Sequence, residues 1–377
     1  MRIALVALYC PSGGMLHYTS QLANALALQA EVHLFSPPNP ELEAYLDPRV
    51  TFQSLHPVTF LGAPLRSYAA QLNPWCHAQN ASVIRAVRPD VVNFVTAHPA
   101  NALLAPMLTP IPIAFTHHDP SGHPGESSRF RDWLIGRILP QARSIIVHGE
   151  ALRDELLAQK VPAERIAVIP HGDYGFLKRY SRELPEEDLI LFFGRFSKYK
   201  GIEVLCQAER LLATRLDGYK LVIAGEGEAD LFRAEIGPSG RVEVVNRFHS
   251  DAEVAQWFQR ARLVVLPYTQ ASQSGVLAIA LAFEKPAIVT AVGGLPEAVQ
   301  HGEAGLIVPP NDPVALADAI EALWKDPDLR QQLSNAGKML VAHQISWPII
   351  ASRYLDAYHR AVGSRRDPVA LETPSAR

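Results

Sequence analysis

The sequence predicts an α/β protein built from two doubly wound domains that face each other across a cleft. Twelve short runs rich in Val, Ile and Leu alternate with longer segments of helical periodicity, which is typical of β-α units on a parallel sheet. The runs are nearly all apolar and do not alternate with polar residues, as expected for strands buried on both faces. Twelve strands exceed the usual width of one twisted sheet, so two sheets are the simpler interpretation.

The expected strands fall into two sets of six. They cover residues 3–8, 31–35, 90–95, 112–116, 144–147 and 167–169 in the first half, and residues 189–193, 220–224, 242–245, 263–266, 287–290 and 305–308 in the second. The segment between the sets, PHGDYGFLKRYSRELPEED, is polar and has no strong period, which is typical of an interdomain linker. We expect domains over residues 1–172 and 189–346 with a linker over 173–188. A helix over 347–362 and a flexible tail over 363–377 follow.

The composition is that of a globular protein and disfavours several classes of function. The chain has 377 residues, of which 48% are hydrophobic and 19% charged, and a formal net charge of −3. We expect no nucleic-acid partner, because proteins that bind polyanions usually carry a basic excess. The cysteines Cys10, Cys76 and Cys206 form no CxxC pair. This spacing disfavours a zinc knuckle or a disulfide framework and is compatible with a reducing compartment.

The start of the chain predicts a buried strand rather than a secretory signal. Its apolar run ends in Pro-Ser-Gly-Gly and continues directly into a helical pattern. No uncharged apolar stretch approaches the roughly 18–20 residues that a membrane span needs. We therefore expect a cytoplasmic protein.

Parallel sheets bind ligands at the carboxyl ends of their strands, and a glycine turn follows the first expected strand. Gly13 and Gly14 stand just before a helical pattern. Two glycines there let the backbone approach a ligand closely and expose amide groups that attract anions. A tight turn that binds nothing is the alternative.

A basic loop follows the strand 189–193. Arg195 and Lys200 lie in the segment GRFSKYKG, between two glycines and before a helix. Cations just past a strand end can hold a diphosphate, Arg as a planar fork and Lys as a point charge. Each such charge-assisted contact is worth roughly 1.5–3 kcal/mol. A solvated basic loop is the alternative, but two cations that bracket one turn favour a binding site.

Two further loops of the second half carry candidate ligand contacts. Ser272, Ser274 and Gly275 stand at the start of a helix, where hydroxyl groups and free amides suit a phosphate, although N-capping by serine explains the pattern too. Glu297 follows the next strand after a Gly-Gly pair. Its carboxylate either faces the cleft from a loop or caps a helix, and the sequence leaves both interpretations open.

A histidine-rich segment ends a strand of the first half. His117, His118 and Asp119 are consecutive, and His123 follows closely. A metal site is disfavoured, because adjacent histidines on an extended chain face opposite ways. We expect His118 to reach a ligand in the cleft.

Together these segments resemble the retaining glycosyltransferases of family four, which have the B-type fold of two facing Rossmann-like domains. The resemblance covers roughly residues 1–362. It rests on GRFSKYKG, VIAGEGE, PYTQASQSG, KPAIVTAVGGLPEAV and EAGLIVPPND in the second half, and on the glycine turn, the strand-end His-Asp pair and VIPHGD in the first. The order and spacing of these motifs are more specific than any single one.

The resemblance implies a nucleotide-sugar donor, a glycan, lipid-linked or small-molecule acceptor, and retention at the anomeric carbon without a metal or a cofactor. No nucleophilic carboxylate is evident, which suits the front-face mechanism commonly proposed for the family. The implied donor contacts are Gly14 to the phosphates, His118 to the sugar, Arg195, Lys200, Ser274 and Gly275 to the diphosphate, and Arg247 and Phe248 to the nucleobase. The terminal helix is expected to cross back onto the first domain.

One departure concerns the donor sugar. The family commonly has two glutamates eight positions apart, and those places hold Ala271 and Ile279 here. The SQSGV version resembles a known subgroup, so the class is unchanged but the identity of the donor is left open. Glu297 is a candidate to take over part of the missing role.

The acceptor is expected in the first domain, where residues Arg129–Arg143 mix arginines with apolar side chains. This basic amphipathic stretch predicts either peripheral contact with a membrane surface or a half-buried structural helix. The rival functions are a sugar-nucleotide epimerase or a phosphorylase of the same fold, and a two-domain sugar-binding protein without transferase activity. A nicotinamide-dependent dehydrogenase is disfavoured, because the first turn lacks GxGxxG.

Overall fold

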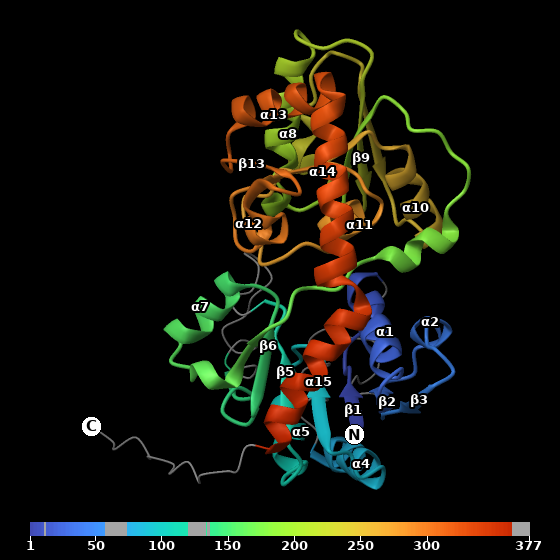
Figure 1. Ribbon diagram of the computed structural model, residues 1–377, viewed down its shortest axis with the longest axis vertical. Coiled ribbons are helices and arrows are strands. Elements are labelled where there is room, and N and C mark those ends of the chain that lie inside the picture. Colours follow the sequence, from blue (N-terminus) through green and yellow to red (C-terminus); the bar gives the residue numbers. More distant parts are fainter. Residues whose placement is uncertain (11–12, 57–73, 120–132, 134–135, 364–377) are drawn as a thin grey trace.

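The chain folds into two parallel sheets, one above the other in Figure 1, with helices on their faces. The computed structural model describes residues 1–10, 13–56, 74–119, 133 and 136–363. Every strand pairing in both sheets is parallel. This architecture confirms the predicted fold class.

The first sheet has seven strands in the order β3-β2-β1-β4-β5-β6-β7. Side chains of β1 alternate between two cores: Ile3 and Leu5 pack with α1 and α15, and Ala4 and Val6 pack with α4 and α5. Burial on both faces explains why these strands are continuous apolar runs. The elements are β1 (Arg2–Val6), α1 (Gly14–Leu26), β2 (Glu31–Ser36), α2 (Pro40–Ala44), β3 (Val50–Ser54), α4 (Pro74–Ala86), β4 (Val91–Phe94), α5 (Asn101–Met107), β5 (Ile113–Thr116), β6 (Ser144–Val147), α7 (Glu150–Ala158), η1 (Ala163–Arg165), β7 (Ile166–Val168) and η2 (Gly175–Tyr180).

The second sheet has six strands in the order β10-β9-β8-β11-β12-β13. One continuous core surrounds it and includes Leu191 of β8, Val265 of β11 and Leu205 of α8. The elements are β8 (Leu189–Phe193), η3 (Lys198–Lys200), α8 (Ile202–Leu212), β9 (Lys220–Gly225), α9 (Asp230–Arg233), β10 (Val242–Asn246), α10 (Asp251–Arg260), β11 (Leu263–Leu266), α11 (Gly275–Ala282), β12 (Ala287–Thr290), α12 (Leu295–Ala298), η4 (Gln300–Gly302), β13 (Leu306–Val308), α13 (Pro313–Lys325) and α14 (Pro327–Leu340).

One strand of the first sheet differs from the sequence prediction. All twelve expected strands are present, but β3 is a thirteenth, at the edge of the sheet, where it pairs with β2. Its sequence, VTFQS, alternates apolar and polar residues, and most of it is half-buried or exposed. A search for continuous apolar runs misses such an edge strand, because only one of its faces is packed.

The chain returns to the first domain through its last helix, as predicted. After α14, a π-helical turn, η5 (Val341–Ile345), leads into α15 (Trp347–Gly363). Figure 1 shows α15 lying along the first sheet beside α1. Buried hydrogen bonds fix it there: the hydroxyl groups of Tyr354 and Tyr18 lie 2.5 Å apart, and the Asn93 amide donates to Tyr358 at 2.8 Å. The fold therefore crosses between the domains twice.

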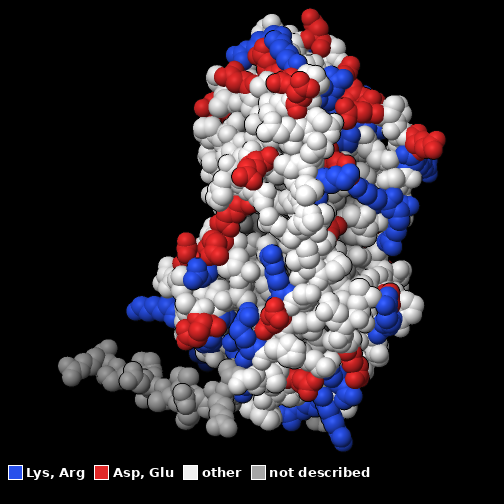
Figure 2. Space-filling model, in the orientation of Figure 1, with Lys and Arg blue, Asp and Glu red and all other residues white. Residues whose placement is uncertain are grey.

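The charges of the described residues are mixed over the outside of the protein. On the face that Figure 2 shows, basic and acidic side chains are interspersed over both domains, and uncharged side chains cover much of the surface over α14. Among the described residues on this face, no extended patch has a single sign of charge.

Candidate active site

A cleft of about 440 Å³ lies between the two domains, at the carboxyl ends of their strands. It is lined by the glycine turn before α1 and by the loops that follow β8, β9, β10 and β11. Eight of the residues that the sequence predicted for donor binding line it: Gly13, Gly14, Arg195, Lys200, Arg247, Phe248, Ser274 and Gly275. The predicted residues His118, Ser272 and Glu297 are not part of this lining.

The basic loop after β8 is held against the loop after β11. Gly201 has a φ of +66°, and a Cβ there would lie 1.9 Å from the carbonyl oxygen of Pro267, so only glycine fits this close approach. The ammonium group of Lys200 lies 3.7 Å from the ring centroid of Tyr268, which orients it by a cation–π interaction. The Tyr268 hydroxyl in turn lies 3.2 Å from Oγ of Ser274. Lys200 and the serine turn therefore face the same space.

The serine turn serves as a helix cap and as part of the cleft. Ser274 is the N-cap of α11, and its hydroxyl oxygen accepts a hydrogen bond from the Leu277 amide at 3.3 Å. The capping interpretation is correct, and it does not compete with ligand binding, because Ser274, Gly275 and Val276 of this turn also line the cleft. Gly275 sits so close to Tyr174 that a Cβ would lie 2.9 Å from the tyrosine hydroxyl.

Tyr174 is a cleft residue that the sequence analysis missed. It is buried, lines the cleft, and places its hydroxyl near Gly14 of the first domain and Gly275 of the second. It lies in the segment 173–188 that the sequence predicted as an interdomain linker, of which 175–180 is a 3₁₀ helix. The local signal that could have indicated it is an aromatic residue close to two glycines, in HGDYGF.

The rim of the cleft at the end of β10 carries Arg247 and Phe248. The Arg247 guanidinium donates to Glu253 at 2.6 Å, and Phe248 leaves 57% of its surface exposed. An exposed aromatic ring beside an oriented guanidinium is a surface on which a planar base can stack. This is the region that the family resemblance assigned to the nucleobase.

A second missed feature joins the two domains across the cleft. Asp251, the first residue of α10, lies 3.1 Å from Nε2 of His17 in α1 and accepts a hydrogen bond from the Tyr45 hydroxyl. Burial acts to raise the pKa of this carboxyl, but the bonds from His17 and Tyr45 and the charge of Arg179 outweigh it and leave the pKa below its ordinary value. The carboxylate is therefore ionised and ties the domains together near the donor cleft.

Ser272 and Glu297 also make contacts between the domains rather than line the donor cleft. The Ser272 hydroxyl donates to Asp119 of the first domain. The Glu297 carboxylate accepts from the Glu150 and Ala151 amides at 2.8 and 3.1 Å. Glu297 is thus a helix cap, as one of its two interpretations proposed, but it caps α7 of the opposite domain rather than its own helix. The donor contact expected for Glu297 stays a prediction.

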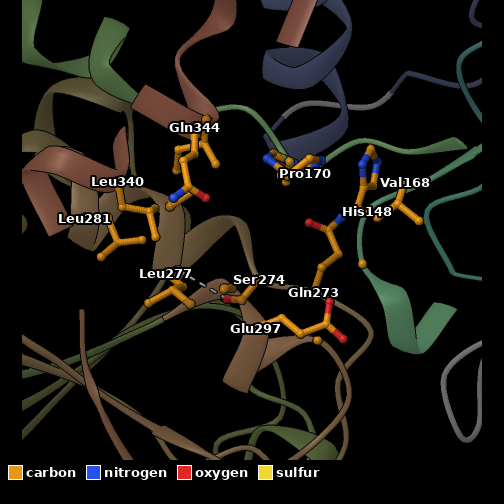
Figure 3. A pocket seen from close by; sticks show the side chains of 16 residues that line it. His148, Val168, Pro170, Gln273, Ser274, Leu277, Leu281, Glu297, Leu340 and Gln344 are labelled. Carbon is orange, nitrogen blue, oxygen red and sulfur yellow. Dashed lines mark hydrogen bonds between the residues drawn. The ribbon is translucent and has the colours of Figure 1, made fainter. Parts of the chain in front are cut away.

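A smaller cavity of about 190 Å³ adjoins the donor cleft between the domains. Figure 3 shows Gln273 reaching toward His148, with Glu297 below it. The leucines on the left of the view form the opposite side of the cavity: Leu277, Leu281 and Leu340. Gln273 and Ser274 line both the cavity and the donor cleft. The two spaces are therefore neighbours that share the serine turn as a wall.

His118 lies behind the cleft in a cluster of imidazoles. Its Nδ1 is 3.0 Å from Nε2 of His148, and the ring centroids of His148 and His171 are 5.5 Å apart. Burial lowers the pKa of His118 to about 3 and that of His171 to about 4, and it places the pKa of His148 well below its ordinary value. In this state His118 is neutral, and each of its ring nitrogens lies 3.0 Å from a polar atom of the protein, Nε2 from the Val95 carbonyl oxygen and Nδ1 from His148.

Two further observations bear on the class of site. No group of three or more His, Cys, Asp or Glu able to hold a metal occurs in the part of the chain that the structure describes, and His123 lies outside that part. Within the described ranges, no helix is both long and apolar enough to cross a bilayer.

Solved glycosyltransferases have the same architecture. The chain is similar to sucrose-phosphate synthase from Thermosynechococcus elongatus, with a TM-score of 0.73, 23% sequence identity, and coverage of 95% of this chain and 98% of the other. It is also similar to HepE of Anabaena in complex with UDP, with a TM-score of 0.75, 18% identity, and coverage of 95% and 100%. The fold is that of the two-domain, B-type glycosyltransferases.

Sequence comparisons define the family. A family model described as "Glycosyltransferase Family 4" matches residues 12–172, and one described as "Glycosyl transferases group 1" matches residues 187–326. A D-inositol 3-phosphate glycosyltransferase of Arthrobacter sp. (strain FB24) is 29% identical over 402 residues, which span 95% of this chain and 93% of the relative. A glycogen synthase of Mycobacterium tuberculosis is 29% identical over 307 residues, which span 75% and 72%.

The chain belongs to the retaining glycosyltransferases of family four, as its motifs indicated. It is an enzyme that transfers a sugar from a nucleotide-sugar donor to an acceptor. The rival interpretations, an epimerase, a phosphorylase or a sugar-binding protein, find no support in these comparisons.

Proposed function

We propose that the donor cleft binds the diphosphate of a nucleoside-diphosphate sugar and that its own cations, rather than a metal ion, stabilise the departing nucleotide. The observation that carries this proposal is the convergence of Arg195, Lys200 and the start of α11 on one cleft. Cleavage of the bond between the anomeric carbon and the donor phosphate leaves negative charge on the phosphate oxygen. Preorganised cations and amides aimed at such a charge are usually the largest catalytic contribution.

The donor sugar enters an environment without the two glutamates that are common in the family. Ile279 is 7% exposed and Ala271 packs against the core, so neither position offers a polar contact. In the proposed reaction a donor phosphate oxygen, which lies on the face that the nucleotide leaves, accepts the proton of the attacking hydroxyl. This route gives transfer on the face that the nucleotide leaves, with retention of configuration.

A thermal-shift screen with UDP, GDP and ADP tests the proposal. One of these nucleotides is expected to raise the melting temperature, because a ligand at 100 times its Kd stabilises a protein by roughly 2.7 kcal/mol. HepE, a similar fold, has been solved with UDP and with UDP-glucose, which makes UDP the first candidate. Stabilisation by a free sugar but by none of the three nucleotides would contradict the proposal and favour a sugar-binding protein.

We also propose that the acceptor docks on the first domain and that Arg129–Arg143 brings this domain to an anionic membrane surface from the cytoplasmic side. Residues 129–132 and 134–135 lie outside the described part of the chain. Support comes from Trp133, which exposes 55% of its surface, and from Arg137, whose guanidinium lies 5.2 Å from the Trp133 ring centroid. Ile138 is fully buried, so part of the segment is also structural.

Liposome co-sedimentation at low salt tests the membrane contact. Vesicles with anionic lipid are expected to pellet the wild-type protein, and Trp133→Ala together with Arg137→Ala is expected to weaken that binding. Vesicles of neutral lipid serve as the control, because they offer no charge to the arginines. Equal recovery of the protein in the supernatant with both kinds of vesicle would end the idea.

A further inference from the structure

His118 and His148 make three short polar contacts in a row. Two neutral imidazoles have only two N–H groups, which is one too few for three hydrogen bonds. Nε2 of His118 lies 3.0 Å from the carbonyl oxygen of Val95, and Nδ1 of His148 lies 2.8 Å from that of Ile169. A carbonyl oxygen only accepts, so each of these outer bonds uses one N–H. The two remaining ring nitrogens face each other at 3.0 Å. A proton between them is required for a third bond.

Proton counting therefore gives two states of the pair. With two protons the pair is neutral, and only two of the three contacts can be hydrogen bonds. With three protons all bonds are made and the pair carries one positive charge. Burial disfavours the charged state in the free protein, as the low pKa values of both histidines show. A buried anion nearby would favour it.

The pair lies one layer of side chains behind the donor cleft. His171, 5.5 Å from His148 between ring centroids, stacks on Tyr174 with ring centroids 5.7 Å apart and an interplanar angle of 8°. Tyr174 lines the cleft beside Gly14 and Gly275. His148 also lines the adjoining cavity, whose wall is the serine turn. A diphosphate on the start of α11 would thus place its negative charge near the pair.

The described groups around the pair do not supply the negative charge that would favour its protonated state. Tyr18 of α1 lies with its ring centroid 4.7 Å from that of His118, and burial raises its pKa, so it is neutral. His171 faces the pair from the loop after β7 and is also neutral. From the second domain, Gln273 and Glu297 share the cavity with His148, and the Glu297 carboxylate is occupied by the amides of α7.

Two groups on the same loop as His118 complete the surroundings. His117 is buried, and burial lowers its pKa to about 4. Asp119 follows His118 directly and accepts from Ser272 of the second domain. Among the described neighbours, only Asp119 and Glu297 carry negative charge, and each is already engaged with the opposite domain.

We propose that the His118–His148 pair takes up one proton when the anionic donor binds, so that donor binding and protonation of the pair are coupled. This inference rests on the proposed function of the cleft. By linkage, the donor raises the proton affinity of the pair, and protonation raises the affinity for the donor by the same factor. The gain in affinity is fully present below the pKa of the free pair and is lost as the pH rises through the pKa of the pair in the complex. Between these two values the affinity falls by up to tenfold per pH unit.

Isothermal titration calorimetry of the full chain with UDP-glucose, GDP-glucose or ADP-glucose tests this coupling. These diphosphate diesters do not titrate near neutral pH, so any proton exchange belongs to the protein. The measured enthalpy in buffers of different ionisation enthalpy gives the number of protons taken up. We expect an uptake of up to one proton for the sugar nucleotide that binds. Binding without any uptake between pH 5 and 8 would overturn the inference, whereas failure of all three to bind would overturn the proposed function on which it rests.

Two variants separate the pair from the rest of the cluster. In His148→Gln, the side-chain amide can donate to Nδ1 of His118 without an added proton, so the proton uptake is expected to vanish while the donor still binds. His171→Gln is the matched control and is expected to keep the uptake. If His171→Gln abolishes the uptake and His148→Gln does not, the proton belongs elsewhere.

A measurement on the wild-type protein guards against variants that do not fold. Long-range ¹H–¹⁵N spectra of protein labelled at histidine distinguish neutral imidazoles from an imidazolium. We expect two neutral rings for the pair in the free protein and one shared positive charge after the sugar nucleotide is added. Unchanged neutral signals in the saturated complex would contradict the proposal.

Discussion

Replacing Arg195 and Lys200 separately by alanine is expected to lower kcat by about 10²–10³ in each variant, because each removes a preorganised charge from the departing diphosphate. KM for the donor should change less than kcat if the contact strengthens as the bond breaks. The two effects should not add in the double variant, because both side chains act on one ligand. Donor turnover at saturating acceptor measures the loss.

Lys198→Ala is the matched control for this prediction. Lys198 lies in the same 3₁₀ turn as Lys200 but is exposed and does not line the cleft. The control variant should therefore keep the wild-type kcat, and the melting temperature of all variants should show that they are folded. Full activity of both Arg195→Ala and Lys200→Ala would remove the basis for metal-free catalysis by this loop.

Local patterns in the sequence were sufficient for twelve of the thirteen strands and for eight of the residues that line the cleft. Strands buried on both faces leave continuous apolar runs, and the glycine turn, the basic loop and the serine turn each follow such a run. A parallel sheet gathers the carboxyl ends of its strands at one edge. The position of Gly14 at the edge of the first sheet, and those of Arg195 and Ser274 at one edge of the second, thus follow from local sequence and topology.

Contacts that depend on how the two domains are placed could not be predicted in this way. Asp251 looks like an ordinary acidic residue in the first turn of a helix, and nothing near it in sequence indicates that His17 and Tyr45 meet it from the other domain. Glu297 likewise could be placed on a cleft loop, but the amides of α7 that it caps come from a different sheet. Such pairs are set by packing between domains rather than by propensity or period.

The imidazole cluster shows the same limit in the first domain. The sequence placed His118 correctly at the end of a strand, but His148 and His171 follow two other strands and carry no local motif that links them to it. Their meeting depends on the order β5-β6-β7 in the sheet. This order brings three strand ends together and buries the rings against α1. The sugar contact expected for His118 stays a prediction; in the structure its ring nitrogens lie 3.0 Å from the Val95 carbonyl oxygen and 3.0 Å from His148.

Trp347→Ala is expected to lower the free energy of unfolding by about 3–5 kcal/mol, in the range for large aromatic residues removed from a core. Trp347 is 8% exposed and begins α15, and its indole nitrogen donates to the carbonyl oxygen of Asp173 at 2.8 Å. It packs on Gly172, where a Cβ would lie 2.5 Å from the indole ring. The same crossing is closed by the Asp173 amide, which donates to the Ile345 carbonyl at 3.0 Å. The Trp347 side chain therefore holds together the two segments of the chain that cross between the domains.

Urea denaturation of a graded set of variants would measure this contribution. Trp347→Phe keeps much of the apolar contact but loses the hydrogen bond, so its loss of stability should be smaller than that of Trp347→Ala. Trp75→Ala is the control, because Trp75 is 71% exposed and surface replacements usually stay within about 0.5 kcal/mol. Because the indole holds the chain where it crosses between the domains, the alanine variant should also bind the donor nucleotide more weakly while Trp75→Ala does not. Equal unfolding midpoints for Trp347→Ala and Trp75→Ala would show that the crossing is held by the tyrosine network of α15 alone.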